Sequence, residues 1–144
     1  MSNESTVHIL NDLLEAEYST LSQHLAESSP FVSMQSAEDQ ALLKRIGADA
    51  KEHEQALADL IFRLRGTPRP PRMPTELGGI HYLTLSYLMP QIVAGLKALV
   101  RKYESASSCG NPEADALISR IGSKYRKQLG ELEARHQQLA AAAH

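Results

Sequence analysis

The chain of 144 residues contains no tryptophan, and aromatic residues make up only 5% of it. Its single cysteine, Cys109, has no second cysteine to pair with, which excludes a disulfide-stabilised scaffold. Charge is balanced at 15 basic and 17 acidic residues, so the composition predicts no nucleic-acid partner. The most apolar stretch, 83–100, is interrupted by polar residues and by Pro90, and no membrane partner is expected. The polar N-terminal sequence lacks the parts of a signal peptide, so we expect one cytoplasmic domain over residues 1–144.

Alanine and leucine supply most of the 42% hydrophobic residues, a composition typical of helices. Six of the seven prolines and four of the eight glycines gather in three stretches, 28–30, 66–79 and 109–112, and Pro90 is the one proline outside them. Four helices are therefore predicted, over about residues 6–27, from the Ser36 cap to just before Gly66, over 80–106, and from the Asn111 cap to about 141. Pro90 is expected to kink the third helix or divide it.

The lengths of the links predict the topology. The first and last links are short, so each should join an antiparallel helical hairpin. The proline-rich link 66–79 could stretch roughly 40 Å at the polyproline rise of about 3.1 Å per residue, enough to follow the length of a bundle. The sequence thus predicts an all-α four-helix bundle made of two antiparallel hairpins joined by a long crossover.

Polar residues interrupt the apolar stripes of the first two helices. Glu17 stands in the centre of a leucine seam, and His53 lies on the inward row of the second helix, with Asp49 one turn earlier. Folding these helices about a turn centred near residue 35 places Glu17 opposite His53. A buried carboxylate needs a partner, and an imidazole at this level can be one.

The fourth helix carries the ExxH motif Glu133-Ala-Arg-His136, which sets a carboxylate beside an imidazole on one helix face. This spacing suits a metal ion. Folding the last two helices about their link places Glu133 opposite Ser86 and His136 opposite Leu83, so the third helix offers no ligand there.

The segment 10–17, followed by Gln23, resembles the first helix of bacterioferritins and other ferritin-like proteins. The resemblance implies that Glu17 is a metal ligand and that His53 corresponds to the histidine of the family's second helix. The ExxH motif described above matches the family's fourth helix. A ferritin-like four-helix bundle and a homodimer are therefore expected, whereas a cage is not expected because no fifth helix follows.

The chain departs from the family at three positions. Ala50 stands where di-iron members have a glutamate, Ser86 stands where the third helix supplies another, and Lys51 replaces the methionine that binds haem in bacterioferritins. An ordinary di-iron centre is therefore not expected.

Two interpretations of the remaining polar residues stay open. In the first, a site with fewer ligands than a di-iron centre binds a single divalent iron, manganese or zinc ion for redox chemistry or metal handling. Its expected ligands are Glu17, His53, Glu133 and His136, with Asp49 as a fifth group. In the second, the same residues form a hydrogen-bonded network without metal, in a degenerate ferritin-like protein that acts as a structural or protein-interaction module.

A third class is an acid–base enzyme without metal, but no feature of the sequence indicates a substrate pocket for it. Whether the protein is an enzyme stays open. His24 is interpreted as an inward-facing polar cap. The tyrosines are interpreted as core and rim packing; they include Tyr82, Tyr87, Tyr103 and Tyr125.

Overall fold

A computed structural model describes residues 3–18, 37–70, 85–106 and 109–142 of the chain, and these residues form four helices without a strand. The helices are α1 (Asn3–Tyr18), α3 (Ala37–Arg63), α4 (Leu85–Ser105) and α5 (Pro112–Ala142). The predicted all-α class is confirmed.

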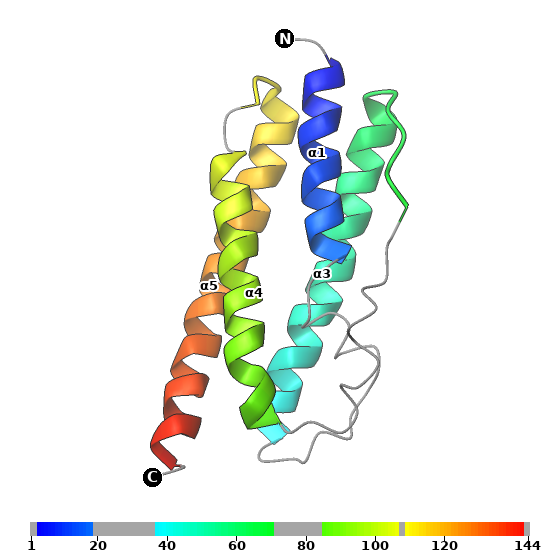
Figure 1. Ribbon diagram of the computed structural model, residues 1–144. Coiled ribbons are helices and arrows are strands. Elements are labelled where there is room, and N and C mark those ends of the chain that lie inside the picture. The colour runs from blue at the N-terminus through cyan, green and yellow to red at the C-terminus, as the bar shows by residue number, and fades with distance from the viewer. Residues whose placement is uncertain (1–2, 19–36, 71–84, 107–108, 143–144) are drawn as a thin grey trace.

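The helices lie side by side along one long axis, with the start of α1 and the end of α5 at opposite ends of the bundle (Figure 1). α1 packs on α3 and α4, and α5 packs on the same two helices. Figure 1 shows that α1 and α5 run in one direction and that α3 and α4 run in the other. Each helix is thus antiparallel to both of its neighbours and parallel to the helix diagonally opposite. The last residue of α3 and the first residue of α4 therefore lie at opposite ends of the bundle.

The core is built from apolar residues of all four helices. The apolar rows of α1 and α3 are fully or almost fully buried at Leu10, Leu14, Leu42, Ile46, Leu57 and Leu60, whereas Leu64 is only partly buried. On α5 the buried row is Ile118, Ile121, Tyr125, Gln128 and Leu132, at the three- and four-residue spacing of one helix face. Burial of each large aliphatic side chain contributes about 1.5–3 kcal/mol of transfer free energy.

The end of α3 differs in detail from the predicted glycine stop. The residue in the left-handed region is Arg65, with φ 65°, and the Gly66 amide donates to the Ile61 carbonyl at 2.8 Å. Gly66 is needed for another reason, because a Cβ built on it would lie 2.6 Å from a methyl carbon of Val7. The glycine therefore allows the end of α3 to approach α1 closely.

The chain after α3 is fastened to α1 by one buried side chain. Asn11 donates from Nδ2 to the Thr67 carbonyl at 3.1 Å and accepts from the Arg69 amide at 2.8 Å. The Arg69 guanidinium then bonds the carboxylates of Asp12 and Glu15, each at 2.8 Å. Residues 67–69 are thus held against α1 by backbone and charged contacts together.

The start of α5 confirms the predicted cap. The Asn111 side chain accepts a hydrogen bond from the Ala114 amide at 3.0 Å. The Asp115 carboxylate accepts from both the amide and the thiol of Cys109, at 2.8 and 3.1 Å, and these two bonds lower the pKa of Asp115. The link between α4 and α5 is thereby attached to the first turn of α5.

The expected level of Glu133 on the hairpin of α4 and α5 was wrong. Glu133 was expected opposite Ser86, but its carboxylate lies 3.8 Å from the Lys97 ammonium, and Arg126 pairs with Glu104 at 3.6 Å. Both ion pairs centre the pairing of the two helices near residue 115, within α5, rather than at residue 109 or 110.

Three other expectations concern the ends of the first and third helices and the effect of Pro90. The extension of the first helix to residue 27, with His24, and the start of the third at 80 lie outside the described residues. α4 continues through Pro90 as one helix, so the predicted division does not occur. Pro90 is exposed and only one turn from the described start of the helix, where it removes a single hydrogen bond. None of the described helices is long and apolar enough to cross a membrane.

Candidate functional site

The centre of the bundle holds a fully buried carboxylate. Glu17 continues the leucine row of α1 and has 0% of its surface exposed. The Tyr125 hydroxyl lies 2.7 and 2.6 Å from its two oxygens, and the Tyr103 hydroxyl donates to Oε1 at 3.0 Å. A buried carboxylate needs hydrogen-bond partners because an isolated buried charge is strongly unfavourable. The two phenols supply such hydrogen bonds.

His53 of α3 completes this group, which we call the Glu17 cluster (Glu17, His53, Tyr103 and Tyr125). The imidazole is buried, and its Nδ1 lies 3.6 Å from Glu17 Oε1. The expected proximity of Glu17 and His53 is confirmed, although this distance is too long for a hydrogen bond, and Nδ1 has no hydrogen-bond partner among the residues that the structure describes. The ring also packs edge to face on Tyr125, with centroids 4.7 Å apart.

The two phenols are held in their protonated form. Burial raises the pKa of Tyr103 and of Tyr125 well above the ordinary value, and the charge of Glu17 beside them raises it further. Each hydroxyl therefore remains a neutral donor to the carboxylate. The cluster joins one residue from each of the four helices.

Asp49 lies one turn from His53 but points to other partners. Its carboxylate accepts from Gln128 Nε2 at 2.6 Å and lies 3.2 Å from the Lys124 ammonium. With 15% of its side chain exposed, Asp49 forms a partly buried ion pair at the boundary of α3 and α5. Its charge is thus compensated by groups of α5.

Glu133 and His136 lie further along α5. The side chain of Glu133 is 41% exposed and pairs with Lys97, and His136 is half-buried with its Nδ1 unbonded. Tyr125 marks the level of Glu17 on α5, so at 1.5 Å per residue Glu133 lies about 12 Å and His136 about 16 Å away along the axis. Metal ligands lie about 2 Å from their ion, so these two residues cannot share an ion with Glu17 in this arrangement.

The predicted ligand set is therefore not assembled at one point. Only Glu17 and His53 meet, and nowhere in the described part of the chain do three or more histidine, cysteine or acidic side chains gather closely enough to hold a metal ion. Resident zinc sites use three or four protein ligands. As placed here, the pair does not fit a resident metal ion by itself.

Sequence reasoning treated Tyr103 and Tyr125 as packing residues and so missed their polar role. A sign of this polar role was present on α5. Tyr125 and Gln128 are polar residues on its buried row, three residues apart like the two residues of the ExxH motif and about two turns before them. On α4, Tyr103 is the buried residue that reaches Glu17.

The cluster can hold a buried charge and join four helices, but its carboxylate is closed to solvent.

Comparison of the chain with protein-family models, with curated proteins and with solved structures found no match.

Proposed function

We propose that this chain is a ferritin-like four-helix-bundle protein in which a metal-free polar cluster occupies the centre, and that it acts as a structural or protein-interaction module. One observation carries the proposal: the Glu17 carboxylate is satisfied by the hydroxyls of Tyr103 and Tyr125. The two hydroxyl groups thus stabilise the buried carboxylate in place of a metal ion.

The ferritin-like assignment is supported by the directions of the helices. α3 and α4 are parallel, although they follow each other in the chain, so the connection between them has to cross the length of the bundle. One long crossover between two antiparallel hairpins is characteristic of ferritin-like bundles. The resemblance of residues 10–17 to the family's first helix agrees with this assignment.

The second candidate function is metal binding at a reduced, mononuclear site. It is favoured by His53, whose buried Nδ1 has no hydrogen-bond partner in the described part of the chain. This atom lies 3.6 Å from Glu17 Oε1, a separation at which both atoms could contact one iron, manganese or zinc ion. Among the described residues, the other groups of the Glu17 cluster that could contact such an ion are the two phenols.

Metal analysis separates the two candidates. The purified protein is dialysed against Fe(II), Mn(II) or Zn(II), and retained metal is measured by inductively coupled plasma mass spectrometry for the wild type, Glu17→Gln and His53→Ala. The metal-free proposal predicts far less than one equivalent in all three proteins and a thermal unfolding curve that a chelator does not shift.

Retention of one equivalent by the wild type and its loss in both variants would overturn the metal-free proposal. Glu133→Gln is the matched control, because Glu133 is a carboxylate paired with Lys97 at the surface. A metal held only by the Glu17 cluster would be retained by this control.

A homodimer without a cage remains our expectation for the assembly. Sedimentation equilibrium measures it directly. A particle the mass of a shell would contradict the expectation.

A further inference from the structure

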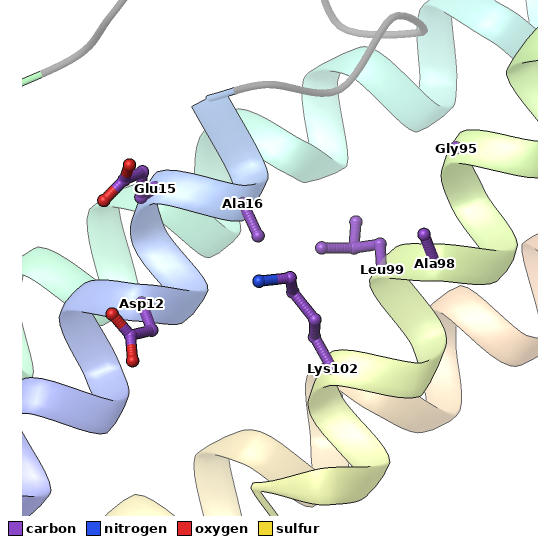
Figure 2. A pocket seen from close by; sticks show the side chains of 7 residues that line it. All are labelled: Asp12, Glu15, Ala16, Gly95, Ala98, Leu99 and Lys102. Atoms are coloured by element: carbon purple, nitrogen blue, oxygen red, sulfur yellow. The ribbon is translucent and has the colours of Figure 1, made fainter.

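A groove runs between α1 and α4. Two adjoining pockets of about 410 and 330 Å³ share Asp12 and Lys102, so they form one continuous depression, which we call the α1–α4 groove. Figure 2 shows the part with the larger volume, with the α1 residues on one side and the α4 residues on the other. The apolar and small residues that line it are Ile9, Leu13, Ala16, Gly95, Ala98, Leu99 and Ala106.

The groove exists because small residues stand where the two helices face each other. Ala16 lies on the α1 side, and Gly95 and Ala98 lie on the α4 side (Figure 2). A Cβ built on Gly95 would have nothing within 4 Å. On α4 the groove extends over residues 95–106, about 16 Å at 1.5 Å per residue, or three helical turns.

The two walls differ in charge. The carboxylates of the α1 wall, Asp12 and Glu15, are both bonded to Arg69. On the α4 wall, Arg101 and Lys102 form no ion pair with any described residue, and Figure 2 shows the Lys102 ammonium extended toward Ala16. The α4 wall therefore presents two positive charges that no described residue pairs, whereas the two carboxylates of the α1 wall share the single guanidinium of Arg69.

We propose that the α1–α4 groove is the docking site for an amphipathic helix of a partner protein. That helix turns small and apolar side chains to the groove and carries carboxylates on the flank that faces Arg101 and Lys102. The proposal deepens the interaction role proposed above and rests on it. A helix suits the site because its side-chain ridges pack into the space between two helices, and the small residues of the groove allow a close approach.

The test uses a fluorescent synthetic peptide of about 18 residues, long enough to form a helix, with leucine and alanine on one face and glutamate along one flank. The matched peptide has lysine at each glutamate position. Fluorescence anisotropy is measured at about 0.05 M salt, where screening of surface charge is weak. We expect the acidic peptide to bind at least about tenfold more tightly than the basic one, and we expect this preference to reverse with Arg101→Glu/Lys102→Glu.

A pair of glycine variants tests the location. A Cβ at Gly95 or at Gly130 of α5 meets nothing within 4 Å, so both positions accept a larger residue, but only Gly95 lines the groove. Gly95→Leu should abolish binding of the acidic peptide, and Gly130→Leu should leave it unchanged.

Equal binding of the two peptides, or binding that survives Gly95→Leu, overturns the proposal. So does self-association of the chain that Gly95→Leu breaks and Gly130→Leu does not, because the groove would then be filled by a second copy. These outcomes are independent of metal retention, so failure of this inference is distinguishable from failure of the metal-free proposal.

Discussion

Tyr125 of α5 places its hydroxyl 2.7 and 2.6 Å from the two carboxylate oxygens of Glu17 on α1. These two helices lie diagonally across the bundle and both pack on α3 and α4. One phenol thus connects two helices that lie diagonally opposite each other, and the bond lies where no solvent reaches Glu17.

Removal of this hydroxyl should be costly. Tyr125→Phe is expected to lower the free energy of unfolding by about 1.5–3 kcal/mol, because hydrogen bonds to charged groups are strong and Glu17 stays buried. Tyr103→Phe should cost less, since its hydroxyl bonds one oxygen at the longer distance of 3.0 Å. Urea denaturation measures both variants. The control is Phe62→Ala, a side chain 65% exposed, which should change stability by less than about 0.5 kcal/mol. Two tyrosine variants as stable as this control would contradict the assigned role.

The same phenols predict how stability depends on alkaline pH. In the folded protein the pKa values of Tyr103 and Tyr125 are raised, first by burial and then by Glu17, above the value of about 10 expected when the chain is unfolded. The folded state therefore binds more protons above pH 10. The stability that the protonated phenols contribute is fully present below pH 10 and is lost as the pH rises beyond it.

Two measurements check this dependence. Tyrosinate absorbance should show two phenols that titrate only when the protein unfolds, and urea midpoints should fall as the pH rises above about 10. Tyr125→Phe should have one such phenol fewer. If both phenols titrate normally in the folded protein, the cluster is not closed to solvent.

Asn11 should matter more than its charged neighbour. Asn11→Ala removes both hydrogen bonds that hold residues 67–69 and leaves two backbone groups without partners, so a loss of about 1–3 kcal/mol is expected. Asp12→Asn, at a side chain 48% exposed, removes an ion pair to Arg69 and should cost no more than about 1 kcal/mol. Chemical denaturation of the two variants gives the comparison, and the opposite ranking would show that Arg69 rather than Asn11 fastens the segment.

Two glycines of α5 should respond oppositely to alanine. Gly130→Ala should raise stability by up to about 1 kcal/mol, because its Cβ meets nothing and alanine favours helix. A Cβ on Gly122 would lie 3.3 Å from the Tyr103 Cβ, and Tyr103 is buried with its hydroxyl bonded to Glu17. Gly122→Ala is therefore expected to destabilise the protein. Thermal unfolding of the pair decides this, and equal gains would mean that Tyr103 can shift.

The fold class and the first hairpin were predictable from the sequence. The helical periodicity of α1 and α3 indicated their buried rows, and folding the two helices about a turn near residue 35 placed Glu17 opposite His53, where the structure has them close together. The ExxH motif showed only that Glu133 and His136 share a helix face. It carried no information on which level of α4 that face would meet, and in the structure Glu133 lies beside Lys97 rather than opposite Ser86.

By itself, the sequence determined which residues form helices and which side of each is apolar, because those properties depend on neighbours within a turn or two of the chain. The tertiary structure decided which polar residues share a level in the core. That depends on the register between helices, which is set by link geometry and close packing such as that of Gly66 on Val7. For this reason Tyr103 and Tyr125, rather than Glu133 and His136, became the partners of Glu17.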